Sequence, residues 1–159
     1  MVFILGKHET RLGARVVREE KVSIMKIELI DLGVTKLPQR AKPMDVGADV
    51  FAPDRYVLGP GETKAIPLGF GIRVPNGYAA FICPKSGLAS RGRTCELSPI
   101  DPSYTGDIHA IVHNGGLDSW HIETGQKIGQ LVIFPCIIAD FVTEPLEERG
   151  ANGFGSTGK

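Results

Sequence analysis

Glycine and proline interrupt this chain so often that long helices are not expected. The 159 residues include 20 glycines and 11 prolines, and the segments between them are short. Proline breaks helices and glycine weakens them, whereas both residues suit tight turns between strands. The sequence therefore predicts an all-β fold, a β-sandwich or a jelly-roll-like barrel, in which polar glycine-rich loops supply the chemistry.

Short alternating or apolar segments are expected to form the strands. These segments are residues 26–32, 55–58, 62–68, 70–74, 78–83, 107–113 and 127–138. Gly59-Pro60-Gly61 and Pro75-Asn76-Gly77 separate two pairs of neighbouring segments, so each pair is expected to form a β-hairpin. The last segment is nearly all apolar, which predicts a strand or strand pair buried on both faces. A helical turn is expected only over residues 86–91.

Composition limits the partners and the environment. The chain has 18 Lys and Arg residues against 18 Asp and Glu residues, so no net charge favours long nucleic acid. A phosphate partner is therefore expected to be a small molecule. No apolar run approaches the length of a membrane span, and the N-terminal apolar stretch is too short for a secretory signal. We expect a cytoplasmic protein without a membrane segment.

Cysteine and histidine patterns do not favour a metal site. Cys83, Cys95 and Cys136 lie far apart without a CxxC motif, which favours reduced, mostly buried thiols over disulfides or a zinc site. His109 and His113 share one strand face without supporting carboxylates, which favours a surface or interface role over zinc binding.

The two ends of the chain differ from its middle. Residues 1–24 are rich in charge and precede the first alternating segment, so they are interpreted as an extension, either an upstream start or an accessory arm. Residues 149–159 are rich in glycine, whose backbone amides can approach anions closely, and they contain a single aromatic ring, Phe154. Hydroxyl and cationic donors for phosphate accompany it: Arg149, Ser156, Thr157 and Lys159. This tail is either a frayed terminus or a lid that closes over a nucleotide.

Two segments before residue 92 present polar groups beside glycine. In residues 44–53, Asp49 either orients water or a basic side chain, or serves a turn before a strand. Residues 84–91 follow an apolar segment that is expected to form a strand, and they contain several groups that could donate hydrogen bonds to phosphate. These donors are Lys85, Ser86, the Gly87 amide and Arg91. Ser86 could equally be the N-cap of a helical turn.

Two later segments carry an acid and an amide. In residues 98–107, Asp101 stands between an isoleucine and a proline, as a water-activating base would need. Tyr104 comes three residues later and either walls a small pocket or packs in a turn. In residues 125–132, Gln130 interrupts an apolar run, so its amide must find a partner on the backbone or on a ligand.

The order of these segments resembles that of the trimeric dUTPase family. The motifs G-x-D-V, P-K-S-G-L-A, I-D-x-x-Y-x-G, G-x-x-I-x-Q-L and R-G-x-x-G-F-G-S-T-G succeed one another with workable spacing over about residues 25–159. The resemblance implies a jelly-roll-like β-clip barrel over residues 25–159, assembled as a homotrimer with active sites at subunit boundaries. Residues 149–159 would be the flexible arm that closes a neighbour's site.

The resemblance also implies a reaction, the hydrolysis of dUTP to dUMP and pyrophosphate, which keeps uracil out of DNA and supplies dUMP for dTMP synthesis. Asp101 would activate the water that attacks the α-phosphorus, and Asp49 would serve the water and metal network. Mg²⁺ would be held chiefly by the triphosphate and not directly by side chains. The substrate-binding residues carried over are Lys85, Ser86, Gly87, Leu97, Ser98, Tyr104, Gln130, Arg149, Phe154, Gly155, Ser156 and Thr157.

Among these residues, those from Leu97 to Tyr104 would read uracil through main-chain groups, and Tyr104 would exclude a 2′-hydroxyl. The chain departs from the family pattern near this hairpin, where Ser98 and Ser103 replace glycine and often an acidic residue. Lys85 stands where arginine is usual, which keeps the charge but gives up bidentate phosphate geometry.

Two alternative functions arise from the same motifs. A dCTP deaminase would need a catalytic glutamate ten positions after Asp101, where this chain has Ile111. A dUTPase-like binding or regulatory module would bind nucleotide without turnover. The presence of Asp101 and of the complete arm motif favours catalysis.

Overall fold

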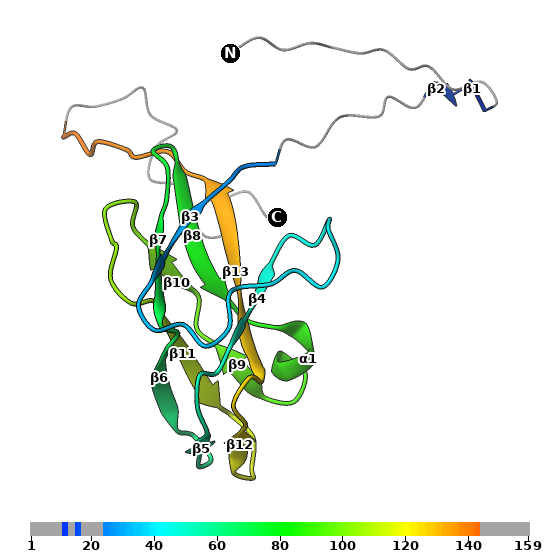
Figure 1. Cartoon of the computed structure of the whole chain (residues 1–159), viewed down its shortest axis with the longest axis vertical. Helices are drawn as coiled ribbons and strands as arrows, with labels where there is room; N and C mark the ends of the chain where they lie inside the picture. Colours follow the sequence, from blue (N-terminus) through cyan, green and yellow to red (C-terminus); the bar gives the residue numbers. More distant parts are fainter. Residues whose placement is uncertain (1–10, 13–14, 17–23, 144–159) are drawn as a thin grey trace, which may run out of the picture.

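The regular elements of the protein are almost all β-strands (Figure 1). The computed structural model describes residues 11–12, 15–16 and 24–143. Its one described helix is the single turn α1 (Ser86–Ala89), where the sequence predicts a helical turn. No described helix has the length and apolar character to cross a membrane. The expected all-β class is therefore confirmed.

Two antiparallel sheets form most of the body. The larger sheet has the strand order β10-β8-β13-β4, and the smaller has the order β6-β11-β9. The strands of the larger sheet are β4 (Ala48–Phe51), β8 (Tyr78–Cys83), β10 (Ser98–Ile100) and β13 (Lys127–Pro135). Those of the smaller sheet are β6 (Thr63–Pro67), β9 (Arg93–Cys95) and β11 (His109–Asn114).

Three further strand pairs complete the fold. All three pairs are antiparallel. The N-terminal pair joins neighbouring segments, and the other two join segments that are distant in the sequence. The pairs are β1 (Arg11–Leu12) with β2 (Arg15–Val16), β3 (Glu28–Asp31) with β7 (Phe70–Arg73), and β5 (Tyr56–Leu58) with β12 (Trp120–Ile122). Residues 28–31 are thus tied to the main domain.

Both hairpins expected from the turn sequences are wrong. Strand β5 pairs with β12 and not with β6, and β7 pairs with β3 and not with β8. The turns themselves form, because Glu62 donates its N–H to the Gly59 carbonyl and Tyr78 donates to the Pro75 carbonyl. Each turn carries the chain from one sheet to another, so that the apolar strands on either side cover different parts of one core.

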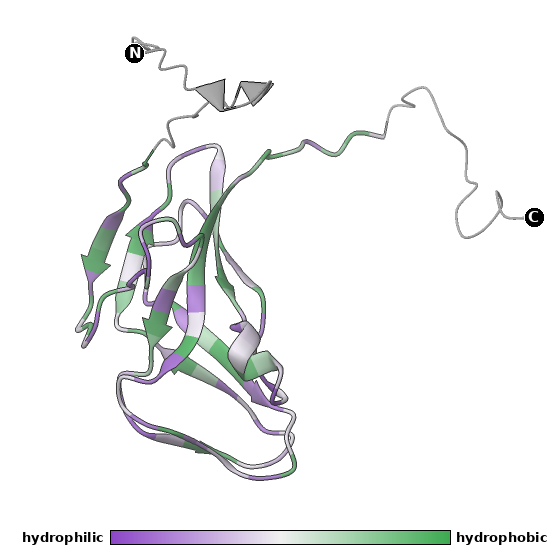
Figure 2. Cartoon of the chain, turned by 90° about the vertical axis from the view of Figure 1, so that its right-hand side faces the viewer, coloured by the Kyte–Doolittle hydropathy of each residue, from purple (hydrophilic) through white to green (hydrophobic). Residues whose placement is uncertain are grey.

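The core lies between the sheets and is built from alternating strand positions. Figure 2 shows hydrophobic and hydrophilic residues alternating along several strands. On β11 and the residue before it, Ile108, Ala110 and Val112 are all at most 2% exposed, which confirms the alternation expected for residues 107–113. The buried Asn114 donates its amide to the carbonyls of Leu58, Gly59 and Asp118, so the loop beyond β11 is pinned to β5.

The apolar stretch 127–138 is buried only in part. Strand β13 ends at Pro135, and Ile137 and Ile138 are 92% and 81% exposed. The expectation of a segment buried on both faces therefore holds only for residues 128–133. The chain leaves the sheet here because Cys136 makes the last backbone hydrogen bond, to the Gly77 carbonyl, and no described strand pairs with residues 137–143.

The three cysteines are free, as expected, but they are not equally buried. Cys95 is buried, Cys83 is half-buried and Cys136 is exposed. Burial raises the pKa of the Cys95 thiol to about 12, so this thiol stays protonated in the folded protein. The expectation of mostly buried thiols is therefore wrong for Cys136, which lies just beyond the end of β13.

We predict that Gly71→Ala destabilises the domain. A Cβ at this buried position in β7 would lie 2.5 Å from the Thr105 carbonyl oxygen and 2.9 Å from that of Gly106. These are backbone atoms, so the strand or the loop must move, at a cost of about 1 to 3 kcal/mol. Urea unfolding followed by circular dichroism measures the change. Gly59→Ala, where a Cβ meets only the Glu62 carboxylate at 3.9 Å, is the control; equal stability of the two variants would contradict the prediction.

Candidate functional site

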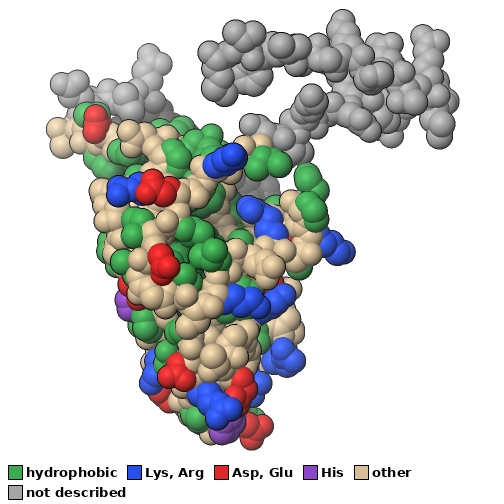
Figure 3. All heavy atoms as spheres, viewed as in Figure 1, with side chains coloured by type: hydrophobic (Ala, Val, Ile, Leu, Met, Phe, Trp, Pro, Cys, Tyr) green, Lys and Arg blue, Asp and Glu red, His purple; other side chains and the backbone are tan. Residues whose placement is uncertain are grey.

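One cleft among the described residues lies between β4 and the start of β13, next to the end of β8. We call it the β4–β13 cleft; its volume is about 370 Å³. Its walls include Asp45, Gly47, Asp49, Lys85, Lys127 and Gln130. On the face drawn in Figure 3, Lys and Arg side chains gather on the side where Figure 1 draws the loop before β4 and helix α1. The cleft is therefore open to small anions.

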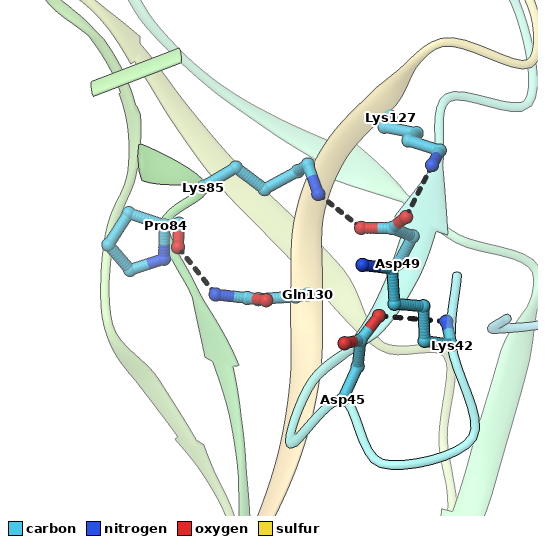
Figure 4. A network of polar contacts seen from close by, with 7 residues as sticks. All are labelled: Lys42, Asp45, Asp49, Pro84, Lys85, Lys127 and Gln130. Atoms are coloured by element: carbon cyan, nitrogen blue, oxygen red, sulfur yellow. Dashed lines mark hydrogen bonds and ion pairs between the residues drawn. The ribbon is translucent and has the colours of Figure 1, made fainter. Parts of the chain in front are cut away.

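Asp49 is the centre of this cleft (Figure 4). Its side chain is 8% exposed, and its two oxygens contact different lysines: Oδ1 the ammonium of Lys85, and Oδ2 that of Lys127 at 2.6 Å. Burial alone would raise the pKa of this carboxyl group. The hydrogen bonds and charges of Lys127 and Lys85 outweigh burial, so the pKa lies below its ordinary value of 3.8.

A β-bulge explains why Lys127 and Gln130 share a cleft. Residues three apart on a regular strand point to opposite faces of the sheet. The register between β13 and β4 shifts between Lys127 and Gly129, so that Lys127 stands opposite Phe51 while Gln130 stands opposite Asp49. Since Asp49 and Phe51 are two residues apart on β4, their partners lie on the same face.

Gln130 closes the floor of the cleft. Its amide donates a hydrogen bond to the Pro84 carbonyl at 3.0 Å, which fixes the backbone just before Lys85. Of the two partners expected from the sequence, backbone and ligand, the structure shows the backbone. Gly47 makes room for this side chain, because a Cβ there would overlap the Gln130 Oε1 atom. The glycine before Asp49 is therefore required by packing.

The second cleft surrounds Asp101, and we call it the Asp101 cleft. It has a volume of about 200 Å³ and its walls include Ser98, Ile100, Asp101, Tyr104, Asp107 and His109. Asp101 is exposed and comes directly after the buried end of β10. Tyr104 donates its N–H to the Asp101 carbonyl and its hydroxyl to the Asp107 carbonyl, and the Asp107 carboxylate accepts from the Gly69 N–H. The acid is thus presented on a braced turn.

Six of the predicted site residues line these two clefts. Asp49, Lys85 and Gln130 line the first. Ser98, Asp101 and Tyr104 line the second, so Tyr104 both walls a pocket and packs in a turn. Leu97 is 62% exposed and is absent from the described walls of both. Five predicted residues of the C-terminal arm lie outside the described residues: Arg149, Phe154, Gly155, Ser156 and Thr157.

Helix α1 lies directly after Lys85 and exposes Ser86 and Gly87. The N-cap position is Lys85 and has no side-chain cap, so the interpretation of Ser86 as an N-cap is wrong. Ser86 instead begins the helix, and none of the hydrogen bonds found among the described residues uses its hydroxyl. The exposed Ser86 hydroxyl therefore remains available at the start of α1.

Sequence reasoning missed Lys127. It begins β13, the strand that also carries Gln130, and it contacts the same carboxylate as Lys85. A lysine directly before an apolar strand is usual at a solvated strand end, so its position alone did not mark it. The signal that could have found it is its place in the G-x-x-I-x-Q-L motif, three residues before the glutamine.

The described residues offer no direct metal site. Among them, no group of three His, Cys, Asp or Glu side chains could hold a metal ion, and Asp49 is engaged by two ammonium groups. His109 and His113 lie on the outward face of β11, where their Nδ1 atoms are 3.0 Å from the Asp107 carbonyl and 2.9 Å from the Thr63 hydroxyl.

A family model and several known sequences resemble this chain. The model of the dUTPase family matches residues 34–158 of this chain. The deoxyuridine 5′-triphosphate nucleotidohydrolase of Leifsonia xyli subsp. xyli is 42% identical over 130 residues, which are 77% of this chain and 86% of that protein. The enzyme of the same name from Tropheryma whipplei is 41% identical over 129 residues, with shares of 77% and 88%.

Solved structures agree with this result. The dUTPase of Staphylococcus bacteriophage 80alpha, solved with dUPNHPP, has a TM-score of 0.73 and 27% identity, over 84% of this chain and 99% of that chain. A mutant dUTPase from phage phi11 of S. aureus, whose structure describes a structural Mg(II) ion, has a TM-score of 0.70 and 22% identity, over 79% and 99%. The jelly-roll-like fold expected from the sequence is therefore shared with solved dUTPases.

We predict that the Asp49 ion pairs make stability depend on pH. Because the pKa of Asp49 is lowered in the folded protein, the stabilisation is complete above about pH 3.8 and is lost as pH falls through the lowered pKa. At pH 7, Asp49→Asn should lower the free energy of unfolding by about 1 to 3 kcal/mol, and this difference should shrink toward pH 3. Urea unfolding across this range measures it, with the exposed Asp118→Asn as control. A difference that stays constant with pH would contradict the prediction.

Proposed function

This chain belongs to the dUTPase family, and we propose that its two clefts hold opposite ends of one dUTP molecule. Its activity is hydrolysis of dUTP to dUMP and pyrophosphate. The observation that carries the proposal is the division of polar groups: two ammonium groups in the β4–β13 cleft, and an exposed carboxylate beside an aromatic ring in the Asp101 cleft. The first arrangement suits a triphosphate, and the second suits a nucleoside and the attacking water.

Asp101 is proposed as the general base. A water-activating carboxylate must be exposed to the cleft, ionised and fixed in position, because proton transfer requires hydrogen-bond contact with the water. Asp101 is exposed, lines a cleft and stands on a turn braced by Tyr104. The Asp101 carboxylate would accept the proton of the water that attacks the α-phosphorus, and pyrophosphate would leave from the opposite side.

The phosphates are proposed to lie along the end of β8 and the start of α1. Lys85 supplies an ammonium group there, and Ser86 and Gly87 supply a hydroxyl and a backbone amide. Gln130 supports this row indirectly, through its hydrogen bond to the Pro84 carbonyl. Lys85, Ser86 and Gly87 would bind charged oxygens mainly by positioned donors, as phosphoryl transfer requires.

Mg²⁺ is proposed to enter with the triphosphate. The residues fit this arrangement better than a protein-held metal, because the described cleft carboxylate Asp49 is neutralised by two lysines and no described cluster of three ligands exists. Mg²⁺ prefers phosphate oxygens and water in such sites, and when bound it neutralises phosphate charge. The role implied for Asp49 in a water and metal network stays a prediction, and its carboxylate also contacts the two lysines.

The base and sugar are proposed to occupy the Asp101 cleft. Tyr104 would pack against the deoxyribose and exclude a 2′-hydroxyl, and main-chain groups near Ser98 would read uracil. The exposed position of Leu97 leaves it a base-binding role only if another part of the assembly covers it. The arm residues Arg149, Phe154, Gly155, Ser156 and Thr157 are proposed to close over the nucleotide, with the phenyl ring on the base.

The homotrimer implied by the family resemblance is proposed here as well, with the β4–β13 cleft of one copy facing the Asp101 cleft of another so that one dUTP molecule meets both. The two clefts share no described lining residue, which is compatible with this arrangement. A second observation supports association: Ile137, Ile138 and Phe141 are at least 81% exposed in the segment after β13. Such a run of exposed apolar side chains suits burial against another copy. The cytoplasm is the proposed compartment, supported by three free thiols.

The direct test monitors the products of dUTP with Mg²⁺ by phosphorus NMR. The wild-type protein is expected to give dUMP and pyrophosphate, and Asp101→Asn to lower the rate by at least about 100-fold with nucleotide affinity nearly intact. Asp118→Asn, an exposed acid outside both clefts, is the control. Unchanged turnover by Asp101→Asn would reject the general base. Release of ammonia from dCTP would instead select a deaminase, and nucleotide binding without any product would select a binding module.

We further predict that Gly87→Ala separates phosphate binding from folding. A Cβ at Gly87 meets no described atom within 4 Å, and alanine favours a helix over glycine by up to about 1 kcal/mol. Thermal stability should therefore be unchanged or slightly higher. The methyl group would occupy space next to the amide, so KM for dUTP should rise roughly five- to 100-fold. Steady-state kinetics measures this, and an unchanged KM would place the phosphates away from α1.

A further inference from the structure

We infer that Lys127 is a second phosphate-binding residue of the β4–β13 cleft, and that Asp49 is a positioning residue that holds Lys85 and Lys127 on either side of the phosphates. This inference rests on the proposed function, since it concerns the same substrate. It assigns a role to a side chain that the sequence motifs did not single out.

The bulge in β13 places Lys127 on the face that carries Gln130 and Asp49, although Lys127 and Gln130 are three residues apart. Without the bulge, a side chain at this position would point to the opposite face of the sheet. Figure 4 shows Lys85 and Lys127 approaching the Asp49 carboxylate from different elements, the end of β8 and the start of β13. The fold thus brings two ammonium groups to one point in the cleft.

The charges of this cluster do not balance. One carboxylate needs one positive charge for neutrality, yet Asp49 has two lysine partners, one for each oxygen. These three side chains therefore carry one surplus positive charge, while the Asp45 carboxylate, elsewhere on the wall of the same cleft, accepts the Lys42 N–H. Only Asp49 is buried and both ammonium groups reach solvent, so an anion such as the polyphosphate of the proposed substrate can contact them from the cleft side.

Lys127 also has hydrogen-bond donors to spare. An ammonium group has three N–H donors and no acceptor. Each lysine contacts one Asp49 oxygen, and the side chain of Lys127 is 48% exposed, against 25% for Lys85. Lys127 therefore keeps donors on the solvent side of the cleft, where phosphate oxygens would lie. Contact with Asp49 limits the motion of both flexible side chains, so less order has to be created when the ligand binds.

The competing explanation is that Lys127 only neutralises Asp49. In that case Lys127 would affect phosphate binding through the carboxylate alone, and its removal would matter no longer once the carboxylate is gone. Under our proposal, Lys127 meets phosphate directly and its removal weakens binding whether or not position 49 is charged. A double-mutant comparison separates the two explanations.

The test measures calorimetric binding of dUpNHpp with Mg²⁺, and of inorganic pyrophosphate, which require no turnover. Lys127→Gln is expected to weaken both by roughly 10- to 100-fold, the usual range for losing a hydrogen bond to a charged group. Lys127→Arg should recover most of the affinity. Lys64→Gln is the matched control, because it removes the same charge from β6, outside both clefts. Equal binding by Lys127→Gln and Lys64→Gln would overturn the inference.

The second arm uses Asp49→Asn alone and combined with Lys127→Gln. A further loss of affinity in the double variant supports direct contact, and binding equal to that of Asp49→Asn overturns it. This comparison also tests direct contact between Lys127 and phosphate if Lys127→Gln alone fails to fold. The double variant has no carboxylate at position 49 that would lose its partner. Wild-type turnover of dUTP is measured in parallel. If the wild-type protein binds the nucleotide without hydrolysing dUTP, the proposed function is wrong, but the comparison of Lys127 variants still tests this inference. If the wild-type protein hydrolyses dUTP and Lys127→Gln binds as tightly as the wild type, only this inference is wrong.

Discussion

Strand β13 is the element on which the site depends, because it pairs with β8 along one edge and with β4 along the other. Gln130 stands opposite Cys83 on one side and Asp49 on the other, so three distant segments meet in one row. The backbone hydrogen bonds between these strands fix the positions of Cys83, Gln130 and Asp49 relative to one another. Residues on loops would be positioned less precisely. The ammonium groups of Lys85 and Lys127 can therefore reach the Asp49 carboxylate from fixed backbone positions.

The two lysines can be understood from the chemistry of the ammonium group. Arginine, the usual residue of the family at position 85, offers a planar fork that engages both oxygens of a carboxylate or a phosphate. Lysine is a compact point charge and engages one oxygen at a time. In this chain Lys85 takes one Asp49 oxygen and Lys127 takes the other, so a pair of lysines provides together the two-point contact that one guanidinium group can give.

The sequence allowed the strands and their buried faces to be predicted, but not which strands pair with one another. The spacing of glycine and proline and the alternation through Ile108, Ala110 and Val112 depend on local geometry, so the strands and the buried face could be inferred. The partner of a strand depends on the whole core, which is why both hairpins were wrong. Lys127 escaped notice because the bulge that turns it into the cleft arises from the shifted register with β4, and the one local sign of that shift, Gly129 within the strand, does not say which side chain the shift redirects.

The separation of the two clefts ties the proposed chemistry to assembly. A nucleotide that contacts the β4–β13 cleft of one copy and Asp101 of another binds only the assembled protein, so by linkage it also stabilises the assembly. The surplus positive charge around Asp49 and the exposed apolar segment beyond β13 would then be satisfied together, the first by phosphate and the second by a neighbouring copy. Substrate binding and subunit association would thus contribute to one equilibrium, in which each single copy carries half of the catalytic groups.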